Sequence, residues 1–214
     1  MSTRNALCPN CGAQITFRWS GAIQTTCEYC KSILVRHDID LAMVGQASDL
    51  PIDISPIQIG TEGVFGSKSF QVIGRIVYRY GLGTWNEWHL YFGDGSSGWL
   101  SDAQAEYALS YLSQPTAPIP AAADLRPGMQ MDQHGILLFM TVLTDARYET
   151  TEGELPFVSY TKEICRFADF RSHDGRFATI DYSESPPLLF LGQFVAFETL
   201  QLKNLREFEG WPAA

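Results

Sequence analysis

Four of the five cysteines fall into two Cys-x-x-Cys pairs that have the spacing of metal ligands. Cys8 and Cys11 form the first pair, and fifteen residues separate them from Cys27 and Cys30. Two intervening residues let both thiolates of a pair bind one tetrahedral metal ion. A separation of about 15–20 residues between pairs is typical of a zinc ribbon. The pattern predicts one structural Zn²⁺ ion held by these four residues.

Two alternatives for the cysteine pairs are disulfides and a redox-active dithiol. Disulfides are rare in the cytoplasm, and the first residues, Met1 to Asn5, lead into Cys8 without an apolar signal segment. We therefore expect a cytoplasmic protein. A redox pair needs a thioredoxin-like strand–helix–strand context, which this sequence does not offer. Four thiolates fill a tetrahedral site, so the zinc is expected to stabilise the fold rather than to catalyse a reaction.

The fifth cysteine, Cys165, lies in an apolar stretch and is predicted to be a small buried residue on a strand. Glu87 and His89 alternate on one face of a predicted strand, so they could form an acid–base pair or half of a metal site. A polar, solvent-facing strand face is the favoured interpretation. Glu154 lies in a turn-like stretch, where it could line a groove or be solvated. Trp85 shares the face of Glu87 and could belong to a binding platform or to the core.

The elements that must position these residues are mostly strands. β-branched and aromatic residues alternate with turn residues from residue 57 onward. One short helix is predicted from Ser101, which could cap it, because alanines and leucine follow. We expect strands at 16–19, 33–35, 70–73, 75–80, 85–92, 136–143, 160–170, 177–182 and 190–202, with a bulge at Gly74, and turns at 93–98, 150–153, 173–175 and 185–187.

The β-rich part of the chain resembles a diverged repeat. Residues 99–101 and 179–181 each follow an Asp-Gly turn, and a proline-rich stretch at 114–127 separates the two halves. The predicted fold is mainly β. A zinc ribbon at 1–44 and a connector at 38–56 precede two small antiparallel barrel-like or bent-sheet units. The first unit covers 57–114 and ends in the short helix, and the second covers 125–206.

Charge argues against general nucleic-acid binding. The chain carries a formal net charge of −9, and an acidic protein is repelled by phosphate backbones. Only residues 1–44 are slightly basic, through Arg4, Arg18, Lys31 and Arg36. A nucleic-acid role would therefore depend on the ribbon alone.

Several segments together resemble a bacterial family of unknown function, numbered 4178. They are the ribbon running into Asp40-Leu41, then 55–63, 72–76, 85–92 and 98–101, with 153–157 and 174–177 in the second half. The Trp-Asn-Glu-Trp segment at 85–88 is the most specific of these. The resemblance covers nearly the whole chain and implies a bacterial cytoplasmic protein with no assigned reaction. It also implies partners that are membrane-associated or belong to envelope-stress complexes.

Three functions compete on this sequence. The favoured one is a non-catalytic adaptor that offers the ribbon and the β units to protein partners. The second is a small-molecule-binding protein or enzyme that uses a polar cleft around Glu87, His89 and Glu154, which requires these side chains to converge. The third is nucleic-acid binding through the ribbon. No phosphate-binding loop or nucleophile elbow is present in the sequence.

Overall fold

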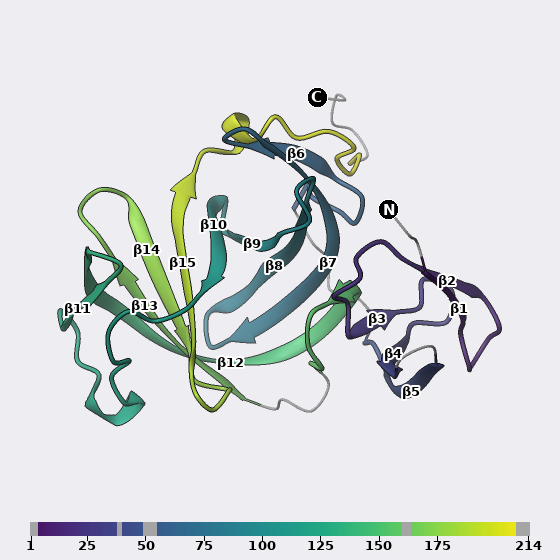
Figure 1. The fold of residues 1–214 in the computed structure, drawn as a ribbon, viewed down its shortest axis with the longest axis horizontal. Helices are drawn as coiled ribbons and strands as arrows, with labels where there is room; N and C mark the ends of the chain where they lie inside the picture. The colour runs from purple at the N-terminus through teal and green to yellow at the C-terminus, as the bar shows by residue number, and fades with distance from the viewer. Residues whose placement is uncertain (1–3, 38–39, 49–54, 160–163, 209–214) are drawn as a thin grey trace.

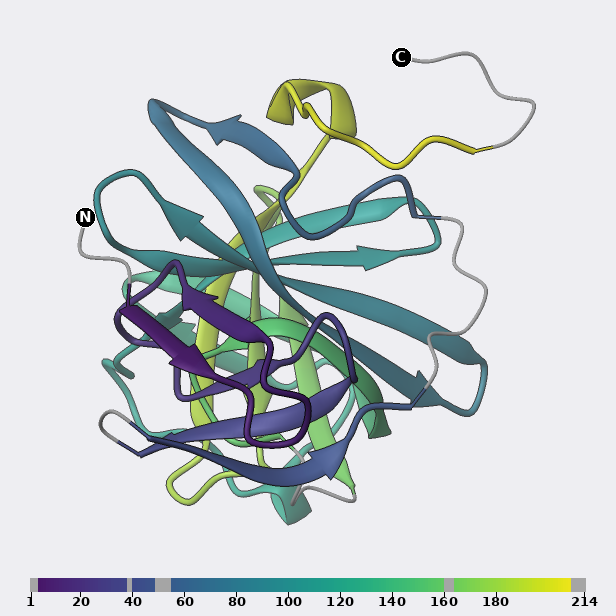
Figure 2. The same ribbon diagram turned by 90° about the vertical axis from the view of Figure 1, so that its right-hand side faces the viewer.

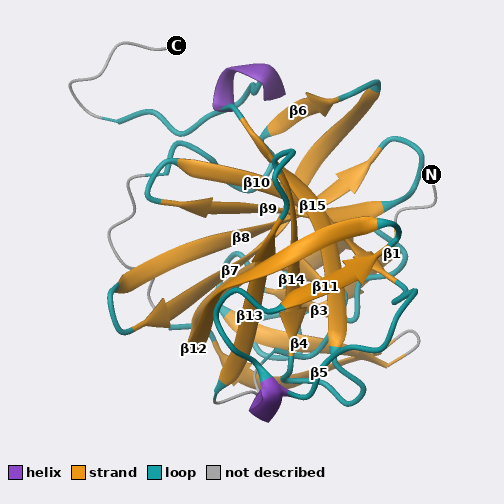
Figure 3. Cartoon of the chain, turned by 90° about the vertical axis from the view of Figure 1, so that its left-hand side faces the viewer, coloured by secondary structure: helices purple, strands orange, loops and turns teal. Residues whose placement is uncertain are grey.

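The computed structural model describes residues 4–37, 40–48, 55–159 and 164–208, which form an almost entirely β-sheet protein (Figures 1 and 3). In this part of the chain, no helix is both long and apolar enough to cross a membrane. The strands are β1 (Arg4–Leu7), β2 (Gln14–Phe17), β3 (Gln24–Thr26), β4 (Ser32–His37), β5 (Asp40–Gln46), β6 (Glu62–Phe65), β7 (Lys68–Tyr80), β8 (Gly83–Phe92), β9 (Ser97–Ala103), β10 (Glu106–Ser113), β11 (Gln130–Gln133), β12 (Ile136–Leu155), β13 (Cys165–Arg171), β14 (Arg176–Asp181) and β15 (Leu188–Val195); the 3₁₀ helices are η1 (Ala122–Asp124) and η2 (Phe197–Leu200).

Eight strands form a closed antiparallel barrel. They pair in the order β7-β8-β9-β10-β15-β14-β13-β12, and β12 then pairs with β7 to complete the ring. Figure 1 shows the curved wall, with β7 and β12 meeting on the side that carries the cysteine-containing module. Ring closure pairs both edges of each of these strands, which removes the exposed edges that an open sheet would leave.

The two halves of the barrel have matching pairing patterns. The β7–β8 register shifts between Val72 and Gly74, and the β12–β13 register shifts between Met140 and Val142. Residues 99–101 and 179–181 occupy corresponding positions in β9 and β14. The two halves pair with each other at two places, β7 with β12 and β10 with β15, and each pair joins strands at corresponding positions of the two halves. The barrel is therefore approximately two-fold symmetric.

The prediction of a mainly β fold with bent antiparallel sheets is confirmed. The two bent sheets close on each other, so the halves share one interior. The domain boundaries at 57–114 and 125–206 stay a prediction.

The largest apolar clusters lie between the outer face of the barrel and the segments that cover it. In the first half, Trp88, Leu90 and Phe92 of β8 pack with Ile57 and Leu200, which come from outside the ring. Because side chains alternate along a strand, the other face of β8 points into the barrel. The second half repeats this packing with Leu125, Leu138, Met140 and Phe170.

The N-terminal module pairs with the barrel through one strand. β1 pairs with β2, and β3, β4 and β5 form a sheet that joins the barrel where β3 pairs with β12. Figure 2 shows this module against one side of the barrel. β5 ends at Gln46, beyond the predicted ribbon boundary at 44, and it occupies part of the predicted connector. Connector residues 38–39 and 49–54 lie outside the described residues.

The helix predicted from Ser101 is wrong. Ser101 lies inside β9, and a hairpin at Gln104 and Ala105 leads into β10. Both turn residues have positive φ, 53° and 64°, as a two-residue hairpin turn requires. Pairing of β9 with β8 and of β10 with β15 outweighs the helix propensity of the alanines.

The turn predicted at 150–153 is also wrong. These residues lie within β12, which continues to Leu155. Gly153 has a φ of 63° and the β7–β12 register shifts between Tyr148 and Thr150, so the turn-like residues bend the strand instead of ending it. The strand expected at 160–170 begins at Cys165, and residues 160–163 lie outside the described part.

Close backbone approach at the β7–β12 seam requires glycine, and this can be tested. A Cβ at Gly74 would lie 2.0 Å from the carbonyl oxygen of Glu154, whereas a Cβ at Gly81 would meet nothing within 4 Å. We expect Gly74→Ala to lower the free energy of unfolding by about 2 kcal/mol or more, because the backbone of the seam must move. Urea denaturation measures this change. Gly81→Ala is the control, and equal stability of the two variants would contradict the proposed crowding.

Candidate functional site

The four cysteines of the N-terminal module lie together. Their sulfur atoms are all within 4.8 Å of one another. Cys8 Sγ is 3.7 Å from Cys30 Sγ, and Cys11 Sγ is 3.8 Å from Cys27 Sγ. These distances are far longer than a disulfide bond, which is about 2 Å. Four thiolates at about 2.3 Å from a tetrahedral metal ion lie about 3.8 Å apart. The four cysteines can therefore hold one metal ion.

Two similar turns present the sulfur atoms. The amide of Gly12 donates to the carbonyl oxygen of Cys8, and the amide of Lys31 donates to that of Cys27. Gly12 and Lys31 both have positive φ, 75° and 57°. Each turn directs both thiols of its pair to the same side, which explains why the two pairs meet.

Glu154 attaches the N-terminal module to the barrel. Its carboxylate accepts the backbone amides of Arg18 at 2.8 Å and Trp19 at 2.9 Å, and the residue is 3% exposed. Burial raises the pKa of this carboxyl, and the two amide donors oppose that rise. The backbone of Glu154 also pairs with Thr25 of β3. This residue therefore has a clear structural role.

His89 is buried at the same junction and does not face solvent as predicted. Its Nδ1 lies 2.8 Å from the carbonyl oxygen of Glu154, and its ring packs between Trp99 and Trp19 at centroid distances of 4.9 and 5.0 Å. Burial lowers its pKa to about 4, so the ring is neutral at pH 7 and Nδ1–H is the donor to Glu154. Nε2 is buried, and none of the residues that the structure describes forms a hydrogen bond with it.

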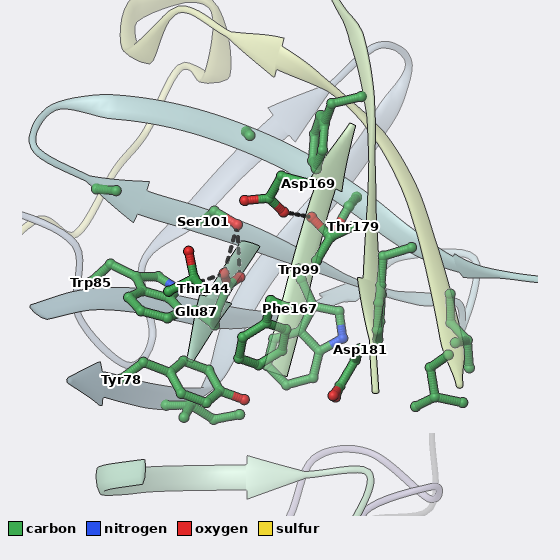
Figure 4. Close-up of a pocket in the computed structure, with 18 of the residues that line it drawn as sticks. Tyr78, Trp85, Glu87, Trp99, Ser101, Thr144, Phe167, Asp169, Thr179 and Asp181 are labelled. Carbon is green, nitrogen blue, oxygen red and sulfur yellow. Dashed lines mark hydrogen bonds between the residues drawn. The ribbon is translucent and has the colours of Figure 1, made fainter. Parts of the chain in front are cut away.

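The interior of the barrel contains a cavity of about 890 Å³. This volume is in the range of small-molecule sites. Side chains from all eight barrel strands line it, and Trp19 and Phe157 contribute from the side of the N-terminal module. The wall is rich in aromatic rings: Tyr78 stacks on Trp85 at 4.8 Å between centroids, and Phe167 meets both rings edge-on. Figure 4 shows these rings around the interior.

Glu87 projects from β8 into this cavity. Ser101 Oγ lies 2.8 Å from both carboxylate oxygens, and Trp85 Nε1 donates to Oε1 at 3.0 Å. Burial raises the pKa of Glu87 to about 7, the two hydrogen bonds oppose the rise, and the nearby charge of Asp169 adds to it. The carboxyl lies deep inside the protein but still has accessible surface, because it faces the cavity.

Asp169 of β13 and Asp181 of β14 enter the same cavity from the second half of the barrel. Thr179 Oγ1 donates to Asp169 at 2.6 Å, and the backbone amide of Ser183 donates to Asp181 at 2.8 Å. Burial raises the pKa of Asp169. Figure 4 shows the carboxylates of Glu87 and Asp169 projecting into one interior space. The cavity thus combines aromatic walls with several carboxylates.

The cleft predicted around Glu87, His89 and Glu154 is only partly formed. His89 and Glu154 contact each other, but neither lines the cavity that contains Glu87. Sequence reasoning missed Asp169 and Asp181, although each stands two residues from another cavity-lining residue, Phe167 and Thr179 respectively. Residues two apart on a strand point to the same face, so this spacing indicates that both aspartates share the face of the lining residues. Cys165 is buried at the start of β13, as predicted.

Residues 58–197 match a family model described as a domain of unknown function, DUF4178, and this match covers more than half of the chain. The chain is a DUF4178 protein. The family resemblance inferred from the sequence is therefore confirmed. In this DUF4178 protein the matched region contains the whole barrel and every cavity-lining residue except Trp19, but not the four cysteines. No curated protein and no solved structure matches it.

The raised pKa of Glu87 predicts a pH-dependent stability. Between about pH 4.5 and pH 7 the folded state keeps a proton that the unfolded chain has lost, so the free energy of unfolding falls as pH rises through this range. The glutamine of Glu87→Gln does not titrate, so its contribution to the free energy of unfolding does not fall over this range. Its amide oxygen can still accept a hydrogen bond from Ser101. We expect the variant to be more stable than the wild type at pH 8, by about 3 kcal/mol at most, and the gap to shrink toward pH 5.

Urea denaturation at the two pH values measures the gap. Glu198→Gln, which removes an exposed carboxylate outside the barrel, is the control and should show little change at either pH. A gap that is the same at pH 5 and pH 8 would show that Glu87 does not carry a raised pKa.

Proposed function

We propose that this DUF4178 protein is a non-catalytic binding protein that holds a small organic molecule inside its barrel. The observation that carries this proposal is the cavity of about 890 Å³ lined by side chains from eight strands. Large aromatic side chains line the cavity instead of filling it, and their packing is supported by apolar clusters on the outer face. A pre-formed, mostly apolar pocket with a few polar groups is typical of a small-molecule site.

We further propose that the four cysteines hold one structural zinc ion. An all-thiolate set with tetrahedral spacing is a common zinc site. In this proposal the zinc fixes the loop that carries Trp19, and the loop in turn contributes to the cavity wall. Zinc binding then supports the barrel site without taking part in chemistry.

The adaptor role predicted from the sequence is the second candidate. Large apolar side chains are exposed around the cysteine cluster, including Leu7 at 68% and Tyr29 at 76%. Such side chains are suited to a protein partner, in particular a membrane-associated one. Nucleic-acid binding through the module has less support, because the rest of the chain is acidic.

The zinc proposal predicts a metal content. Elemental analysis of the purified chain should find about one zinc per chain, and Cys27→Ser should lose the zinc and the structure of the N-terminal module while the barrel keeps its β signal in circular dichroism. Cys165→Ser is the matched control, because Cys165 lies outside the cluster. A Cys27→Ser protein that retains a full zinc complement would contradict the assignment.

The cavity proposal predicts binding of a neutral apolar dye. N-phenyl-1-naphthylamine should bind the wild type with increased fluorescence, and Ala108→Trp should abolish this binding because Ala108 lines the cavity and is 6% exposed. Leu137→Trp, at a position of β12 that is 47% exposed and outside the cavity lining, should bind as the wild type does. Unchanged binding by Ala108→Trp, or none by the wild type, would overturn the proposed function.

A further inference from the structure

The charged residues that line the cavity are mostly acidic. The single arginine among the described lining residues, Arg171, forms an ion pair with Glu106 at 3.2 Å, and both side chains are about half exposed. This pair lies at the rim. Among the described residues, no arginine or lysine forms a hydrogen bond with Glu87, Asp169 or Asp181, and Arg171 acts on Asp169 through its charge alone. The acidic lining residues are Glu87, Glu106, Asp169, Asp181 and Glu184.

Two inner carboxylates have an oxygen available to a ligand. Asp169 uses Oδ1 to accept from Thr179, and Asp181 uses Oδ1 to accept from Ser183. Among the described residues, neither Oδ2 has a hydrogen-bond partner. Asp181 is only 7% exposed. Because both residues line the cavity, these oxygens lie against its empty space, and an unneutralised buried carboxylate is costly.

Aromatic faces lie next to these carboxylates. Trp85 donates its indole N–H to Glu87 and stacks on Tyr78, and Phe167 lies edge-on to Trp85 at 6.0 Å. The faces of such rings attract cations, most strongly where water is excluded. The carboxylates and the ring faces therefore both favour a positively charged ligand.

A metal ion fits this cavity less well than an organic cation. Among the described residues, only the four cysteines bring three or more metal-ligand atoms close together. The cavity carboxylates are spread over β8, β13 and β14 and separated by aromatic rings. A bulky ammonium group with an apolar body would satisfy both the carboxylates and the rings.

We propose that the cavity binds an organic cation, with its ammonium group between Glu87 and Asp169 and its apolar part against Trp85, Tyr78 and Phe167. This inference rests on the proposed function, since it names the ligand class of the same site. It assigns the charge selectivity to the carboxylates and the affinity for the body of the ligand to the rings.

The test compares two probes of the same shape. Phenyltrimethylammonium carries a permanent positive charge, and tert-butylbenzene is its neutral analogue. Both are measured by displacement of N-phenyl-1-naphthylamine from the zinc-loaded full chain. We expect the cation to bind the wild type at least tenfold more tightly than the neutral analogue.

Variants assign the selectivity to the carboxylates. Glu87→Gln combined with Asp169→Asn should lower the affinity for the cation about tenfold relative to the affinity for tert-butylbenzene. Glu198→Gln, which also removes an acidic charge but lies outside the barrel, should bind the cation as the wild type does. Equal affinity of the two probes, or an equal loss of cation binding in Glu198→Gln, would overturn the inference. If either result is found while the wild type still binds the dye, the proposed function of binding a small organic molecule is not contradicted.

The pH profile separates a contact from a structural effect. The cation should bind more tightly as pH rises from 5.5 to 8, because the carboxyl of Glu87, with a pKa of about 7, loses its proton. The charged groups near this carboxyl are Asp169 and Asp102. Tyr78, Asp181, Glu184 and the Glu106–Arg171 pair also line the cavity. Glu87→Gln should reduce the rise to less than twofold. A profile that is flat in the wild type, or equally steep in the variant, would contradict the inference.

Discussion

One strand holds the structure together. β12 pairs with β11 and β13 along its first part, with β7 where the barrel closes, and with β3 where the N-terminal module joins. Its bulges and the positive φ of Gly153 bend it between these partners. Without the β7–β12 seam, the barrel strands would form an open curved sheet with two exposed edges. The cavity and the attachment of the module therefore depend on the same strand.

The arrangement of apolar residues explains how the barrel can keep an open interior. Trp88 and Phe170, both fully buried, pack in clusters between the outer wall and covering segments. Because much of the apolar packing lies outside the ring, the inward cluster around Tyr78 and Trp99 does not have to fill the interior. Glu87 and Asp169 can then occupy inward positions, although burial of their carboxyls opposes folding.

Sequence patterns predicted local features well and long-range ones poorly. The cysteine spacing predicted a cluster of four thiols, and the bulge at Gly74 followed from its place between two apolar runs. Local propensity failed at Ser101, where pairing with neighbouring strands decided the structure. His89 was expected to face solvent, yet Trp19 covers it from about seventy residues away in sequence. Closure of the ring brings Glu87 near Asp169, and no short-range pattern contains that contact.

Trp19 belongs to the module that carries the four cysteines, and it also lines the barrel cavity. A molecule in the cavity that touches this ring therefore interacts with a residue whose position depends on the cysteine loops. Thermodynamic reciprocity follows: if metal occupancy changes the affinity of the cavity, then an occupant of the cavity must change the affinity for the metal by the same factor. The indole ring of Trp19 is the side chain through which the two proposed sites would be linked.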